Sequence, residues 1–134
     1  MDCSGTIYYL LRKHRFKDIP RDSRNQYAWL VDKGTVRTVA EEEMSKFDPR
    51  TLRPGDLLFW TGTYQVNGGN GISHVMLFLG TEKGTGKPIM WGASDGRTYD
   101  GKQRYGVSVF DFKLPRLESK SRFVGFGQIP TPTK

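Results

Sequence analysis

The chain has 134 residues, which is the size of one domain and too short for two independent hydrophobic cores. Hydrophobic residues make up 36% of the sequence in runs of only a few residues, which excludes a membrane-spanning helix of ~20 residues. The 21 Lys and Arg against 14 Asp and Glu give a formal charge of +7, which attracts polyanions in general without identifying one.

Two helices are predicted first along the chain. Residues 4–15 carry apolar side chains at the i, i+3, i+4 spacing of one helical face, with Cys3 in the first turn and Asp2 or Ser4 as the cap. A second helix is predicted over residues 24–33, after an N-cap at Ser23 and before Gly34. Its apolar face is expected to consist of Tyr27, Leu30 and Val31. No basic and apolar leader precedes the first helix, so no signal peptide is expected in the chain.

The rest of the chain predicts strands separated by turns rich in Gly, Asn and Asp. A short strand is expected at residues 36–39, and five longer ones at residues 57–60, 72–79, 88–93, 107–112 and 123–129. Residues 94–104 are predicted to form a polar loop. Helices followed by neighbouring strands favour an α+β domain over residues 2–129, with helices on an antiparallel sheet of about five strands and a tail at 130–134.

The single cysteine cannot form an internal disulfide, so Cys3 is either a small core residue or a nucleophile. A helix N-terminus lowers a thiol pKa, which favours a reactive thiolate at Cys3. His14 would lie roughly 16 Å along the same helix, too far to act as its base. His74 starts an apolar strand next to a Gly-rich loop and is therefore the candidate base.

Four motifs together resemble the NlpC-type cell-wall cysteine peptidases, in the order of that family and across about residues 2–95. They are Asp2-Cys3-Ser4-Gly5, residues 19–27 (IPRDSRNQY), residues 52–60 (LRPGDLLFW) and Ser73-His74-Val75. The resemblance implies a papain-like fold in which Cys3 is the nucleophile and His74 the base, with no cofactor and no metal. It also implies that the Cys3 amide donates to the oxyanion. The residues expected to line the substrate pocket are Asp2, Ser4, Ser73 and Trp60.

The sequence departs from the family pattern at two points. Family members often carry a His, Asn or Gln on the next strand to orient the base, and Gly92 stands at that position here. Ser94, Asp95 or a backbone carbonyl would have to replace it, unless Cys3 and His74 act as a dyad. The family's segment before the Cys motif is also expected to be lacking.

The implied function is hydrolysis of bacterial peptidoglycan stem peptides after a γ-D-glutamyl residue, next to diaminopimelate or lysine. The expected partners are the stem peptide and an anionic wall polymer, and the expected location is the periplasm, the cell surface or the medium. Two alternatives stay open: a papain-like thiol amidase or acyltransferase acting on a protein or lipid, and a non-catalytic wall-binding module. No nucleic-acid motif is present, so no nucleic-acid partner is expected.

Overall fold

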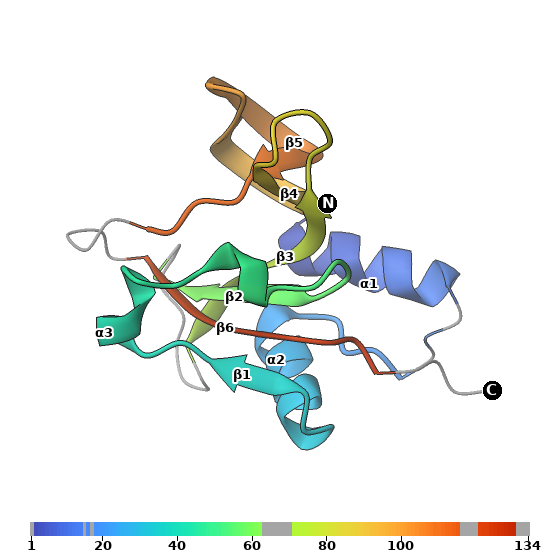
Figure 1. Ribbon diagram of the computed structural model, residues 1–134. Coiled ribbons are helices and arrows are strands. Elements are labelled where there is room, and N and C mark those ends of the chain that lie inside the picture. Colours follow the sequence, from blue (N-terminus) through green and yellow to red (C-terminus); the bar gives the residue numbers. More distant parts are fainter. Residues whose placement is uncertain (1, 15, 17, 63–70, 116–120, 131–134) are drawn as a thin grey trace.

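The computed structural model describes residues 2–14, 16, 18–62, 71–115 and 121–130, without the side chains of residues 41 and 95. Within these residues, short helices come first and a run of strands follows (Figure 1). The elements are α1 (Cys3–Lys13), α2 (Ser23–Asp32), β1 (Val36–Thr38), α3 (Glu41–Met44), the 3-10 turn η1 (Pro49–Thr51), β2 (Leu57–Thr61), β3 (Ile72–Thr81), β4 (Pro88–Tyr99), β5 (Lys102–Asp111) and β6 (Arg122–Gly127). The Gly-rich loop that the sequence predicts before His74 spans residues 67–71, and only Gly71 of it lies within the described residues.

The strands form one antiparallel sheet in the order β1-β6-β2-β3-β4-β5. The α+β class is therefore confirmed, whereas the described sheet has six strands and not about five. The sequence-based loop at residues 94–104 is wrong, because β4 continues to Tyr99 and β5 begins at Lys102. The turn between them is Asp100-Gly101, with both residues at positive φ. Asp-Gly is a strong hairpin signal. The strands on either side face solvent and carry many polar residues, so they lack the apolar pattern that predicts a strand.

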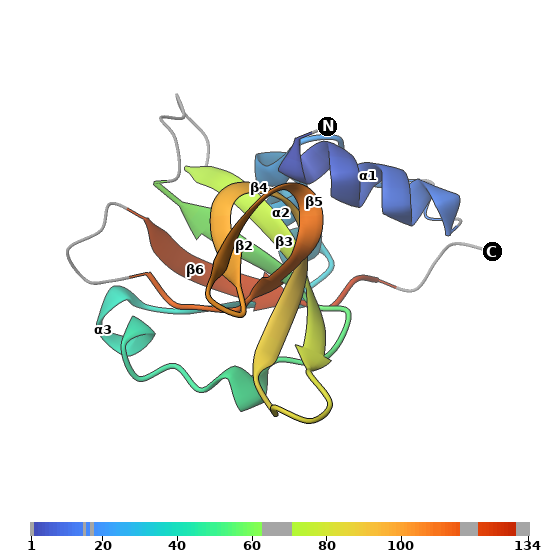
Figure 2. The same cartoon turned by 90° about the horizontal axis from the view of Figure 1, so that it is seen from above.

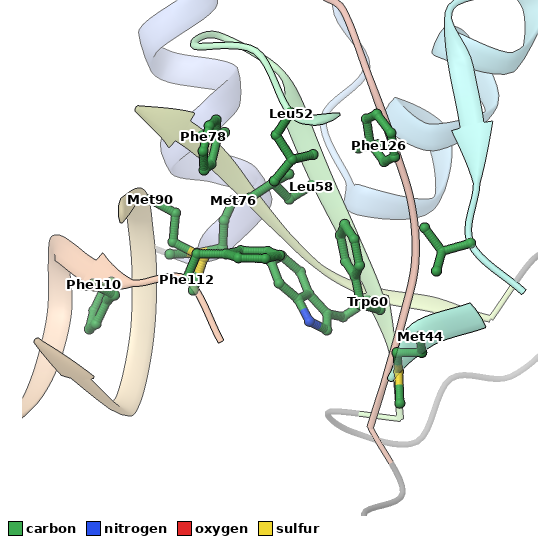
Figure 3. Packing of buried hydrophobic residues seen from close by; sticks show 12 residues of the cluster. Met44, Leu52, Leu58, Trp60, Met76, Phe78, Met90, Phe110, Phe112 and Phe126 are labelled. Carbon is green, nitrogen blue, oxygen red and sulfur yellow. The ribbon is translucent and has the colours of Figure 1, made fainter. Parts of the chain in front are cut away.

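The sheet separates two hydrophobic clusters. Along β2, Leu57 and Phe59 pack on the side that carries α1 and α2, while Leu58 and Trp60 pack on the opposite side. Figure 3 shows this second cluster, in which the indole of Trp60 lies beside Phe112, with a ring-centre distance of 6.3 Å. Figure 2 shows the long β4–β5 hairpin curling over the sheet. The end of β2 is thus held rigidly where β3 begins.

Both predicted helices exist, but the second differs in two details. Its N-cap is Asp22, whose carboxylate accepts a hydrogen bond from the backbone N–H of Asn25, and not Ser23. Its core-facing residue is Leu30, which is fully buried, whereas Val31 is 53% exposed. Asp22 and Ser23 are both good capping residues, so composition alone does not choose between them.

Candidate active site

The first motif is built around the N-terminus of α1. The Asp2 carboxylate caps the helix by accepting from the Gly5 N–H at 2.7 Å. Arg21 forms an ion pair with that carboxylate at 3.2 Å and donates to the Ser4 hydroxyl at 3.3 Å. A Cβ on Gly5 would lie 2.5 Å from the Asp2 carboxylate and 2.7 Å from the Arg21 guanidinium, so only glycine leaves room for this contact.

The second motif, residues 19–27, is bound to the Cys3 turn by the buried side-chain amide of Gln26. The side-chain N–H groups of Gln26 donate to the backbone carbonyls of Ser4 and Pro20 at 3.1 and 3.0 Å. Gln26 lies on α2 and has no exposed surface. The segments around Cys3 and Arg21 therefore form one rigid unit, which fixes the turn that carries the thiol.

Replacing Asp2 with Ala is expected to lower the free energy of unfolding by about 1 kcal/mol, the usual cost of losing an N-cap. Most of that cost should come from the cap, because both partners of the ion pair with Arg21 are more than half exposed. Asp2→Asn is the matched control, since Asn also caps but cannot form the ion pair, and urea unfolding compares the two. If Asp2→Asn lowered the free energy of unfolding as much as Asp2→Ala, the cap would not account for most of the cost.

The Cys3 sulfur lies beside β3, two residues beyond the end of the β3–β4 ladder. The ladder between these strands ends at the pair Leu77 and Trp91. Beyond that point the backbone N–H of Val75, the residue after His74, lies near enough to the sulfur to lower the pKa of the thiol, as do the N–H groups of Ser4 and Cys3. The structure thus places the half-buried Cys3 thiol against the strand residue that follows His74.

The expectation of a resting thiolate at Cys3 is wrong for this structure. Burial raises the pKa of the Cys3 thiol, and the surrounding N–H groups lower it by less. The Asp2 carboxylate that caps the same helix adds to the increase. The helix N-terminus is present as predicted, but desolvation of the sulfur outweighs it.

His74 carries a buried, neutral imidazole. It is only 7% exposed, and its pKa falls from 6.5 to about 3 because burial disfavours the imidazolium and the Arg97 charge repels it. Its Nε2 atom is buried and has no hydrogen-bond partner among the described residues. At neutral pH the Cys3 sulfur is therefore a protonated thiol and the His74 imidazole is neutral. His14, in contrast, is exposed just after the end of α1.

The residues expected to line the pocket fall into two groups. Asp2 is exposed and Ser4 is buried, and both are held by Arg21. Ser73 and Trp60 have no exposed surface, so their contact with substrate stays a prediction that would require them to become accessible. The Trp60 ring instead packs against the His74 ring, with their ring centres 5.7 Å apart.

The site has no orienting side chain at the family position. A Cβ on Gly92 would lie 2.8 Å from the Met76 sulfur, so the close approach of β3 and β4 leaves no room for one. Ser94 is half-buried in β4, and within the described part of the chain its hydroxyl does not reach the Nε2 atom of His74. Asp95 lies in β4 opposite Tyr105, and its side chain is outside the described set. The contact with the Trp60 ring is what holds the imidazole.

Replacing Gly92 with Ala is expected to destabilise the fold by about 1–3 kcal/mol, the range for overpacking. The contact of the new methyl group with Met76 adds to the backbone strain of a side chain at φ 157°, so part of the cost should disappear in a Met76→Ala background. Thermal unfolding of both single variants and the double variant measures this coupling. Fully additive costs would show that the Met76 contact is not responsible.

The sequence did not predict that a charged residue, Arg97, lies near His74. Arg97 is half-buried on β4, and its guanidinium carbon lies 4.9 Å from the centre of the Trp60 ring. Its charge acts on both Cys3 and His74. Since residues 94–104 were predicted to form a loop, no pattern placed Arg97 near His74. The only available signal was the Asp-Gly turn, which pairs this stretch as a hairpin.

Two cavities lie away from this pair, beside β1 and β6. Their volumes are about 390 and 670 Å³, and both are lined by Arg37, Thr51 and Phe126. Neither contains a cysteine or histidine. The described residues also contain no cluster of His, Cys, Asp and Glu that could hold a metal ion. Cys3 and His74 therefore stay the predicted nucleophile and base.

Comparison with known proteins identifies the family of the chain. Residues 1–90, about two thirds of the chain, match the family model described as the NlpC/P60 family. The match includes all four motifs, from the Cys3 turn to Ser73-His74-Val75. No curated protein and no solved structure matched the chain. Because this family model matches more than half of the chain, the chain belongs to the NlpC/P60 family.

Proposed function

We propose that this protein is a cell-wall hydrolase that cleaves peptide bonds in peptidoglycan stem peptides by Cys-His acyl-enzyme catalysis. The observation that supports it best is the approach of the Val75 N–H to the Cys3 sulfur, because Val75 is the residue that follows His74 in β3. The NlpC/P60 family is one of cell-wall peptidases and hydrolases, generally cysteine peptidases or amidases. The family and the geometry thus support the same chemistry.

The proposed reaction starts from the neutral pair. As the Cys3 sulfur attacks the scissile carbonyl carbon, His74 accepts the thiol proton. The carbonyl oxygen becomes an oxyanion next to the N–H of Cys3. The carbon–nitrogen bond then breaks, and His74 gives its proton to the leaving amine. Water attacks the resulting thioester while His74 takes its proton, and the proton returns to the sulfur as the acid leaves.

The proposed substrate bond follows a γ-D-glutamyl residue and precedes diaminopimelate or lysine. The +7 charge would hold the protein near an anionic wall polymer. The family is generally extracytoplasmic, which supports action in the periplasm, at the cell surface or in the medium. In the described part of the chain, no helix is long and apolar enough to cross a membrane.

Digestion of purified peptidoglycan tests the proposal. The protein should release fragments with a new γ-D-glutamyl carboxyl end and a matching free amine, identified by mass spectrometry. Cys3→Ala is the control and should release none. Absence of stem-peptide fragments, or the same fragments from Cys3→Ala, would contradict the proposal. A panel of protein amides and lipid esters would then identify a different acyl substrate.

A further inference from the structure

A cation, Arg97, lies beside the reacting pair. It follows a bulge in β4, between Asp95 and Arg97. Its guanidinium packs on the face of Trp60, and the same indole ring packs against His74. A guanidinium stacked in this way keeps its N–H edge available for a planar anion.

Arg97 has no anionic partner among the described residues. The four ion pairs found there join Arg21 to Asp2, Arg50 to Asp48, and Lys87 to Asp100 and Asp111. Its cross-strand neighbour is Arg104, which carries the same charge. Removing a guanidinium from water is unfavourable without a carboxylate or phosphate to pair with. As far as the structure describes the chain, the hairpin therefore presents a cation without a paired anion beside Trp60 and His74.

This charge has opposite effects on the two reacting groups. Burial lowers the pKa of the Arg97 guanidinium, while a negative charge on Cys3 raises it, so Arg97 favours ionised sulfur. The same charge opposes protonation of His74, after the larger effect of burial. His74 must carry a proton during the reaction, so neutralising Arg97 at the moment of binding would assist the chemical step.

We propose that Arg97 binds a carboxylate of the substrate beside the scissile carbonyl. The inference rests on the proposed function, and it adds a specificity residue to it. A γ-linked glutamyl residue uses its side-chain carboxyl in the peptide bond and leaves its α-carboxylate free. Only three carbon atoms separate that carboxylate from the carbonyl carbon that Cys3 attacks. Arg97 thereby selects stem peptides with a free glutamyl carboxylate over those in which it is amidated.

The test compares two stem peptides that differ only in this group, one with the free α-carboxylate and one with the carboxamide. Wild-type protein should cleave the carboxylate with a kcat/KM about 10- to 100-fold higher, the range for a charge-assisted bidentate contact. Arg97→Gln should bring the ratio close to one, chiefly by raising KM for the carboxylate peptide. Arg97→Lys should retain part of the preference, since Lys keeps the positive charge but cannot donate the two parallel hydrogen bonds of a guanidinium.

Arg104→Gln is the matched control, because it removes the same charge from the opposite strand. The Arg104 side chain stacks on Tyr99 and donates to Ser108 and Val109, so its loss should leave the ratio unchanged. Calorimetric binding of both peptides to Cys3→Ala protein gives the same comparison without turnover and without changing Arg97. Equal kcat/KM and equal binding of the two peptides would overturn the inference about Arg97 but leave the proposed function intact. Cleavage of neither peptide overturns the proposed function and the inference with it.

Discussion

Replacing Cys3 with Ala is expected to lower kcat/KM for a stem peptide by at least about 10³-fold, since removal of a covalent nucleophile costs that much or more in hydrolases of this type. The loss should be confined to activity. Cys3 is half-buried at the start of α1, and Ala removes only the sulfur atom and is a good helix former. Steady-state cleavage of a defined peptide, together with thermal unfolding, measures both effects.

The control for this variant must keep the helix turn and alter a neighbouring polar group. Asp2→Asn meets that need, because it leaves the Cys3 thiol in place and retains a capping side chain. It should keep measurable turnover while Cys3→Ala has none. Residual cleavage by Cys3→Ala within about tenfold of wild type would show that the thiol is not the nucleophile.

Acidification is expected to destabilise the fold through His74. The unfolded chain binds a proton near pH 6.5, whereas native His74 binds one only near pH 3. Stability from the buried neutral imidazole is therefore complete above pH 6.5 and falls as the pH drops towards 3. This single group should lower the free energy of unfolding by about 3 kcal/mol between pH 7 and pH 4.

Urea unfolding at pH 7 and pH 4 measures this loss, with His74→Phe as the comparison. Phe cannot titrate and still packs on Trp60, so the loss between the two pH values should be smaller by most of that amount. His14→Gln is the control, because His14 is exposed at the end of α1 and its replacement should keep the full dependence. An unchanged pH dependence in His74→Phe would mean that His74 is not held neutral by burial.

Much of the architecture could be predicted because local signals and tertiary structure agree. The apolar spacing and capping residues of α1 mark its limits, and the Arg-Pro-Gly-Asp turn leads directly into β2. In that turn Asp56 accepts from the Arg53 N–H, and Gly55 takes a positive φ of 94°. Short-range physical chemistry determines these elements, so the sequence alone reveals them.

The β4–β5 hairpin could not be predicted in the same way. Its strands carry many polar residues, so neither alternation nor apolar content distinguishes residues 94–104 from a loop. The location of Arg97 depends on that hairpin and on the bulge that precedes it. The position of a charged side chain that depends on strand pairing leaves no local pattern in the sequence. The location of Arg97 near His74 could therefore be found only from the structure.

The protonation state of the reacting pair also depends on tertiary structure. A helix N-terminus predicted an acidic thiol at Cys3, but the burial that overrides it comes from packing against β3. Likewise, the low pKa of His74 comes from burial and from Arg97, which lies 23 residues further along the chain. Which residues react could be proposed from motifs, whereas how they are charged required the fold.

Capture of the acyl-enzyme by hydroxylamine tests the central claim most directly. If Cys3 forms a thioester, added hydroxylamine should compete with water and convert part of the released γ-D-glutamyl acid into its hydroxamate, identified by mass spectrometry. The hydroxamate fraction should rise with hydroxylamine concentration in the wild type, and no product should form with Cys3→Ala. Cleavage that yields only the free acid at every hydroxylamine concentration would contradict a covalent intermediate on Cys3.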